Sequence, residues 1–118
     1  MNVLFVCTAN RLRSPTAETL FKNDPRIEVR SAGLDPDCPT PLVQDLVDWA
    51  DLIFVMENAQ REKIRKKYKQ RPADGRIINL NLPDEYERDQ PELIDLLNMK
   101  VPPRIESALR AMDRSLDE

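Results

Sequence analysis

The chain has 118 residues and a net charge of −3, and 41% of its residues are hydrophobic and 33% charged. This length predicts one domain, residues 1–118, whose core can form without disulfides or metal ions. The chain has no histidine and only two cysteines, which excludes Ser-His-Asp and Cys-His catalysis, a disulfide scaffold and a four-ligand zinc site.

The first part of the chain predicts a strand, a loop, a helix and a second strand. Residues 2–7 form an apolar run, NVLFVC, typical of a strand that is buried on both faces. Ser14 is expected to cap the following helix, with Pro15 as its first residue and an end near Asn23. Residues 27–31, IEVRS, alternate in polarity and predict a strand that ends by Gly33.

The rest of the chain continues to alternate. The expected elements are a helix at 41–50, a strand at 51–56, a charged helix at 58–70 and a strand at 76–80. A loop at 81–90 leads to a helix that Pro91 opens. Because proline breaks helical hydrogen bonding, Pro102 and Pro103 are expected to separate this helix from a last one.

Strands that alternate with helices predict an α/β three-layer sandwich with a four-stranded parallel sheet. In such sheets, ligands bind outside the carboxyl ends of the strands, near the point where the strand order reverses. The first strand delivers Cys7 to that edge. We therefore expect the functional site in the loop that follows this strand.

The loop at residues 7–14 reads CTANRLRS and lies between a buried strand and the start of a helix. Backbone N–H groups of a curled loop and of a helix start form a concave anion site. Arg13 can hold two oxygens of a tetrahedral oxyanion, and the same positive field favours a thiolate at Cys7. The candidate phosphate-binding residues are Thr8, Ala9, Asn10, Arg11, Leu12, Arg13 and Ser14.

Residues 3–18 read VLFVCTANRLRSPTAE and resemble the amino-terminal signature of the low-molecular-weight protein tyrosine phosphatases. The matching residues are Cys7, Asn10, Arg13, Ser14, Pro15, Ala17 and Glu18. Further segments at 30–33, 51–56 and 83–86 are similar to that family's S-A-G segment, third strand and P-D-P-Y loop. The resemblance covers most of the chain.

The resemblance implies a phosphomonoester hydrolase, expected to be a protein tyrosine phosphatase. Cys7 would attack phosphorus and form a phosphocysteine, Arg13 would bind the phosphoryl oxygens, and Asp84 would be the general acid. Ser14 would hydrogen-bond the sulfur, and Asn10 would adopt a positive φ. Taken alone, Asp84 could also be an ordinary turn residue after Pro83.

The same resemblance implies no cofactor and no metal. The expected partners are a phosphorylated protein or a small phosphomonoester, with inorganic phosphate or sulfate as ligands of the loop. The negative net charge argues against nucleic acid as a partner. Neither a membrane-spanning run nor a signal peptide is recognisable, so we expect a cytoplasmic protein without a membrane partner.

The chain departs from the family pattern in its loop and its pocket. Ala9 replaces a glycine and Leu12 a second cysteine, and the segment between Gly33 and Asp51 is shorter than usual. Cys38 is either an idle buried thiol or a redox partner that forms a disulfide with Cys7. Few aromatic residues are available to line a phosphotyrosine slot.

Three assignments stay open. Tyr86 is the candidate aromatic wall of the pocket, or a plain surface tyrosine. Arg11 is either solvated or lines the pocket entrance. Residues 61–71 contain seven basic side chains against Glu62 alone, which indicates either a solvated helix face or a patch that docks an acidic partner.

Two other functions fit the same loop. An arsenate reductase would use the cysteine to attack arsenic, but it needs resolving thiols, and only Cys38 is present. A phosphocarrier or phosphate-binding module would hold phosphate without hydrolysing it. Such carrier domains lack the Arg-Ser ending of the loop and the downstream acid, whereas this chain has Arg13, Ser14 and Asp84.

Overall fold

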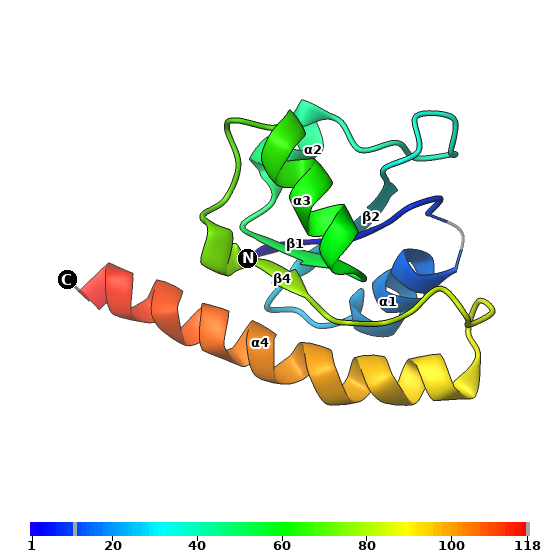
Figure 1. The fold of residues 1–118 in the computed structure, drawn as a ribbon. Coiled ribbons are helices and arrows are strands. Elements are labelled where there is room, and N and C mark those ends of the chain that lie inside the picture. The colour runs from blue at the N-terminus through cyan, green and yellow to red at the C-terminus, as the bar shows by residue number, and fades with distance from the viewer. Residues whose placement is uncertain (11, 118) are drawn as a thin grey trace.

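The computed structural model describes residues 1–10 and 12–117, with side chains as far as residue 113. Its strands form one parallel sheet in the order β2-β1-β3-β4 (Figure 1). The strands are β1 (Asn2–Cys7), β2 (Glu28–Gly33), β3 (Leu52–Val55) and β4 (Ile77–Asn79). The helices are α1 (Arg13–Phe21), α2 (Gln44–Trp49), α3 (Asn58–Lys67) and α4 (Pro91–Asp117). The predicted α/β fold with four parallel strands is confirmed.

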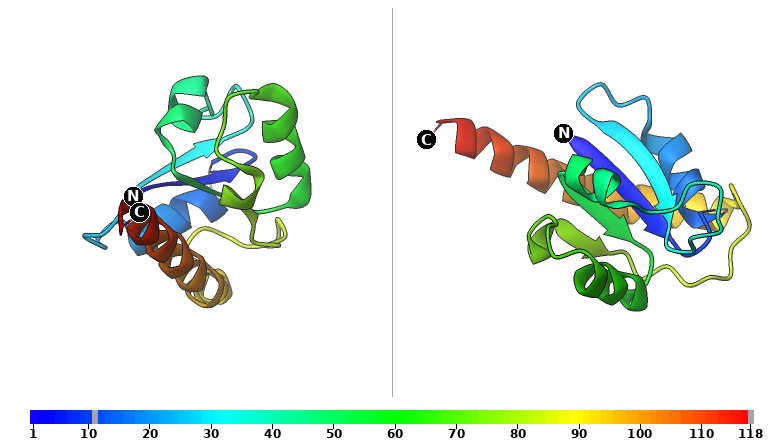
Figure 2. Two further views of the ribbon diagram at one scale, coloured as in Figure 1. Left: turned by 90° about the vertical axis from the view of Figure 1, so that its left-hand side faces the viewer. Right: turned by 90° about the horizontal axis from the view of Figure 1, so that it is seen from above.

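The sheet is the middle of three layers, because alternate residues of each strand pack on opposite sides. In β1, Val3, Phe5 and Cys7 pack in the cluster that includes residues of α1 and α4. Leu4 and Val6 pack with residues of α2 and α3 on the other side. Figure 2 shows the sheet between these two helix pairs. Both faces of β1 are therefore buried, as its continuous apolar run predicts.

The direction of winding reverses at β1. Its neighbours are β2 on one side and β3 on the other, so the helices that follow β1 and β3 leave toward opposite faces of the sheet (Figure 1). This reversal opens a crevice at the carboxyl ends of β1 and β3. Arg13, in the first turn of α1, is thereby brought beside Glu57, which lies just beyond the end of β3.

Several elements begin or end at other residues than predicted, because backbone pairing competes with helix formation. The second strand ends at Gly33 as predicted, but α2 starts only at Gln44, because the Leu42 amide donates to Gly33 O (2.7 Å) in an extended segment. Helix α3 ends at Lys67. The next residue, Tyr68, is extended, and its hydroxyl donates to Leu42 O (2.9 Å).

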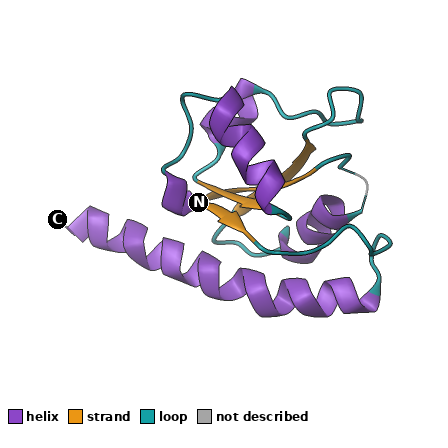
Figure 3. Cartoon of the chain, viewed as in Figure 1, coloured by secondary structure: helices purple, strands orange, loops and turns teal. Residues whose placement is uncertain are grey.

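The predicted break at Pro102 and Pro103 is wrong, since α4 is one continuous helix that contains both prolines (Figure 3). An apolar stripe runs unbroken past them and consists of Leu93, Leu97, Val101 and Ile105, all nearly fully buried. Pro103 is exposed on the opposite side of the helix. Burial of each such side chain stabilises the fold by roughly 1.5–3 kcal/mol, and the four side chains together exceed the cost of the prolines.

No helix in the described part of the chain could span a membrane.

The continuous helix predicts that Pro103→Ala stabilises the protein. Alanine restores a backbone donor in the helix interior, so we expect the free energy of unfolding to rise by about 1–3 kcal/mol in urea denaturation. Pro91→Ala is the matched control, because proline is favourable in the first turn, and this change should give no gain. An unchanged or lower stability of Pro103→Ala would contradict a continuous helix.

Candidate active site

Cys7 ends β1 and is 3% exposed at the carboxyl edge of the sheet. Its Sγ lies 2.9 Å from the Ser14 hydroxyl, which in turn donates to Asn10 Oδ1 at 2.7 Å. Asn10 has a φ of 51°, in the left-handed region that asparagine tolerates. The expected contact of Ser14 with the sulfur and the expected positive φ of Asn10 are both present, and the loop curls around Cys7.

Helix α1 does not start as predicted, because Ser14 is not its cap. The helix begins at Arg13 with Leu12 at the N-cap position, and Leu12 O accepts hydrogen bonds from the amide and the hydroxyl of Thr16. Ser14 and Pro15 therefore lie inside the first turn, where both are buried. Because the Ser14 hydroxyl is held by Cys7 and Asn10, it makes no capping bond.

Arg13 is 3% exposed and its guanidinium is held from two further segments of the chain. Nη1 donates to Glu57 Oε1 at 2.5 Å and to the carbonyl oxygen of Leu82 at 2.6 Å. Nη2 lies 3.9 Å from Asp84 Oδ1. A buried guanidinium needs such partners, because desolvation of an unpaired charge is costly. These contacts aim Arg13 across the crevice between β1 and β3.

Glu57 and Gln60 were not predicted as site residues, although both contact the loop or its arginine. Gln60 is 2% exposed. Its Oε1 accepts the amides of Met56 and Glu57, and its Nε2 donates to Thr8 Oγ1 at 3.2 Å. The sequence signal is Glu-x-x-Gln directly after a buried strand, a pattern of helix N-termini. Such a helix start after β3 must lie beside the loop after β1.

A cavity of about 210 Å³ opens at the loop and is lined by Cys7, Thr8, Ala9, Leu12, Arg13 and Asp84. The Asp84 side chain is 66% exposed, which leaves its carboxyl group accessible from solvent. The structure thus brings together the predicted nucleophile, arginine and acid. This volume suits a phosphoryl group better than a large ligand.

Tyr86 is placed differently from the expected pocket wall. Its ring packs against the core cluster on the α1 and α4 side, where burial of the ring is favourable, and it does not line the Cys7 cavity. The described lining of that cavity contains no aromatic side chain. Arg11, the other candidate at the entrance, lies outside the described residues.

Cys38 is buried beside the loop, and both it and Cys7 are free thiols. Gly33, the register partner of Cys7, separates Cys38 from the loop. A Cβ on Gly33 would lie 2.6 Å from Cys38 Sγ, 2.9 Å from Thr8 O and 3.0 Å from Asn10 N. A disulfide between Cys7 and Cys38 under oxidising conditions stays a prediction, which peptide mapping after peroxide treatment tests.

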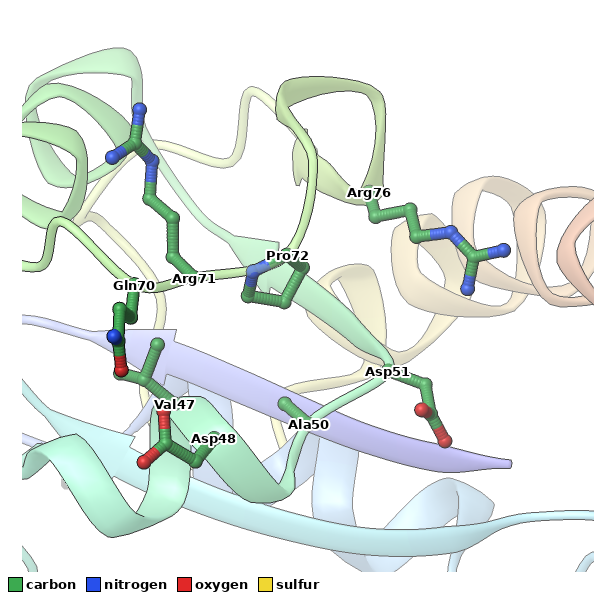
Figure 4. Close-up of a pocket in the computed structure, with 8 residues that line it drawn as sticks. All are labelled: Val47, Asp48, Ala50, Asp51, Gln70, Arg71, Pro72 and Arg76. Atoms are coloured by element: carbon green, nitrogen blue, oxygen red, sulfur yellow. The ribbon is translucent and has the colours of Figure 1, made fainter.

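A different pocket, of about 340 Å³, lies at the amino ends of β3 and β4, away from the carboxyl ends that carry Cys7 (Figure 4). Asp48, Asp51, Arg71 and Arg76 contribute its charges. The residues that line it include no cysteine, serine or threonine, so it offers no thiol or hydroxyl nucleophile. Within the described residues, no group of three histidine, cysteine or acidic side chains could hold a metal ion.

The crowding around Gly33 predicts that Gly33→Ala damages the loop. The added methyl group must displace backbone atoms of Thr8 and Asn10, so we expect thermal or urea denaturation to show a loss of about 1–3 kcal/mol. Gly75→Ala is the matched control, because a Cβ there meets nothing within 4 Å. Equal stabilities of the two variants would show that the loop tolerates the methyl group.

Comparison with known proteins relates this geometry to one family. A family model described as low molecular weight phosphotyrosine protein phosphatase matches residues 2–38. The low molecular weight protein-tyrosine-phosphatase Ptp of Acinetobacter johnsonii is 31% identical over 75% of this chain and 82% of its own length. The protein-arginine-phosphatase of Bacillus subtilis (strain 168) is 30% identical over 58% of this chain and 63% of its own length.

A solved structure agrees in fold. The tyrosine phosphatase Wzb from Escherichia coli K30, in complex with phosphate, superposes with a TM-score of 0.73 and 23% identity. The match covers 90% of this chain and 96% of the Wzb chain. The Acinetobacter johnsonii relative, which is 31% identical and is covered over 82% of its length, shows with the family model that the chain belongs to the low molecular weight protein-tyrosine-phosphatase family.

Proposed function

We propose that the protein is a cysteine-dependent phosphatase that hydrolyses phosphomonoesters, with phosphotyrosine in proteins as the substrate class. The observation that carries the proposal is the cavity in which Cys7, Arg13 and Asp84 meet. The thiol, the guanidinium and the carboxyl group are the three functions that hydrolysis through a covalent intermediate needs. Membership of the family supports the same assignment.

In the first step, the Cys7 thiolate attacks phosphorus in line with the departing oxygen. An S–P bond forms while the P–O bond to the substrate breaks, and the Asp84 carboxylic acid donates its proton to the leaving oxygen. Arg13 and the backbone amides of the loop bind the other phosphoryl oxygens, whose negative charge they stabilise. The product alcohol leaves, and a phosphocysteine remains.

In the second step, water attacks phosphorus and the S–P bond breaks. The Asp84 carboxylate takes the proton from this water, which returns Asp84 to its acid form and releases inorganic phosphate. As the sulfur becomes a thiolate again, the Ser14 hydroxyl, 2.9 Å from Cys7 Sγ, turns its proton from Asn10 Oδ1 to the sulfur and stabilises it. Both half-reactions therefore use the same pair of residues, with the proton moving in opposite directions.

Hydrolysis of p-nitrophenyl phosphate across pH tests the proposal. We expect turnover without added metal, a loss of at least about a thousandfold in Cys7→Ser and a loss of roughly 10²–10³ in kcat for Asp84→Asn. Asp35→Asn is the matched control, because this exposed aspartate follows β2 at the same edge and does not line the cavity. Equal activity of Asp84→Asn and wild type would exclude Asp84 as the general acid.

The two other functions give different results in this assay. Thiol-dependent turnover of arsenate without phosphatase activity would indicate a reductase. A well-folded wild type that binds phosphate but hydrolyses no ester would indicate a binding module or phosphocarrier. Either result would overturn the proposed hydrolysis.

A second substrate class, phosphoarginine in proteins, is favoured by the lining of the cavity. The described lining has no aromatic side chain that would stack on a phenyl ring, and Tyr86 packs elsewhere. One of the relatives is a protein-arginine-phosphatase. Two peptides that differ only in carrying phosphotyrosine or phosphoarginine decide between the classes, since the ratio of their kcat/KM values reports specificity directly.

Glu57 is expected to position Arg13 for catalysis. Glu57→Gln removes the charged partner of a buried guanidinium, so we expect kcat/KM to fall by about tenfold to a hundredfold, with weaker inhibition by inorganic phosphate. Glu62→Gln is the control, because Glu62 pairs with Arg65, away from the cavity. Loss of stability without weaker phosphate inhibition would assign Glu57 a structural role only.

A further inference from the structure

The basic stretch of residues 61–71 divides into two chemically different sides. Each of its arginines donates at least one hydrogen bond within the fold. Arg61 donates to Ile77 O at 2.8 Å and to Asp74 O at 2.9 Å, Arg65 pairs with Glu62 and Asp74, and Arg71 donates to Tyr68 O. The arginines therefore fasten α3 and the turn that follows it to the segment before β4.

The lysines of the same stretch lie at the surface. Among them, Lys63, Lys66 and Lys67 are exposed and line a cavity of about 320 Å³ together with Leu34, Leu42 and Tyr68. We call these six residues the lysine groove. Its lining contains no acidic side chain. Three cations without an acid in a concave surface create a positive potential that attracts an anionic partner.

The floor of the lysine groove is apolar and held in place. Leu42 is 6% exposed and Tyr68 is 5% exposed. The Tyr68 hydroxyl donates to Leu42 O at 2.9 Å, which joins the two sides of the floor. Such a floor can bury one apolar side chain of a ligand, while the lysines at the rim bind its negative charges.

Both walls of the lysine groove continue into the Cys7 loop. The Leu34 amide donates to Cys7 O at 3.0 Å, and the Asp35 amide donates to Thr8 O at 2.8 Å. On the other side, α3 follows directly after Glu57, which binds Arg13. Lys63 and Lys67 come six and ten residues after Glu57, or roughly 9 and 15 Å along the helix axis.

We propose that the lysine groove binds an acidic peptide segment, with one apolar side chain, that flanks the phosphorylated residue of a protein substrate. This inference rests on the proposed phosphatase function and names the sequence context in which that activity is highest. An extended peptide advances about 3.3 Å per residue, so the acidic and apolar residues belong about three to five positions from the phosphorylated one. The charges of groove and segment are complementary, and the contacts outside the cavity add affinity that a small phosphate ester lacks.

The test compares two phosphopeptides that differ only at these flanking positions, which carry Asp, Glu and Leu in one and Ser and Ala in the other. Both carry whichever phosphorylated residue the wild type hydrolyses faster. The groove variant is Lys63→Glu with Lys67→Glu. The matched control is Lys22→Glu with Arg104→Glu, two exposed positions on the α1 and α4 side that give the same change of net charge.

We expect the wild type to prefer the acidic peptide by about tenfold in kcat/KM, through KM, with the preference shrinking at high salt. The groove variant should lose the preference, the control should keep it, and all three proteins should hydrolyse p-nitrophenyl phosphate equally. No preference in the wild type, or the same loss in the control, would overturn the inference while p-nitrophenyl phosphate turnover leaves the proposed function intact.

A second experiment measures binding of the acidic peptide without its phosphate by fluorescence anisotropy. It distinguishes a failure of the lysine groove from a failure of the proposed phosphatase function. Tighter binding to wild type than to the groove variant supports the groove. If the wild type shows no turnover of p-nitrophenyl phosphate, the proposed function fails by itself, and peptide binding would then no longer be substrate docking. Phosphopeptide turnover with equal peptide binding by both proteins would contradict the groove alone.

Discussion

The buried guanidinium of Arg13 is the constraint on which the site depends. A charge that is 3% exposed must find partners, and it finds them in Glu57 after β3 and in the carbonyl oxygen of Leu82 after β4. The Leu82 amide in turn donates to Met56 O at 2.8 Å. This bond extends the pairing of β3 and β4 and holds the Leu82 carbonyl group in position. One side chain thereby ties together three segments that are distant in sequence.

The loop around Cys7 is shaped by close contacts as well as by hydrogen bonds. Asn10 accepts a positive φ, and its side chain binds Ser14, which contacts the sulfur. Gly33 provides the space between this loop and Cys38, because a Cβ at this position would lie 2.6 Å from Cys38 Sγ and 2.9 Å from Thr8 O. The nucleophile is therefore positioned by the backbone of two neighbouring strands, β1 and β2.

Helix α4 shows how tertiary packing overrides a strong local signal. Two adjacent prolines normally end a helix, and Pro102 and Pro103 predict such a break here. In the folded protein, the stripe that runs from Leu93 to Ile105 lies against the sheet, and a break would expose part of it. The same competition applies at Ser14, where a tertiary contact with Cys7 replaces the expected capping bond.

Asp84 became a candidate only through the resemblance of its loop to the family, whereas the sequence by itself determined the order of strands and helices, the parallel sheet, the edge that carries Cys7 and the loop that contains Arg13. These features are local, since they depend on apolar periodicity, on turn residues and on a short motif. Only the tertiary structure decided that Glu57, Gln60 and the Leu82 carbonyl join the site, and that Tyr86 packs against the core instead of lining the cavity. These contacts depend on the reversal of winding at β1 and on the three-dimensional packing of the loops, and neither leaves a periodic signal in the chain.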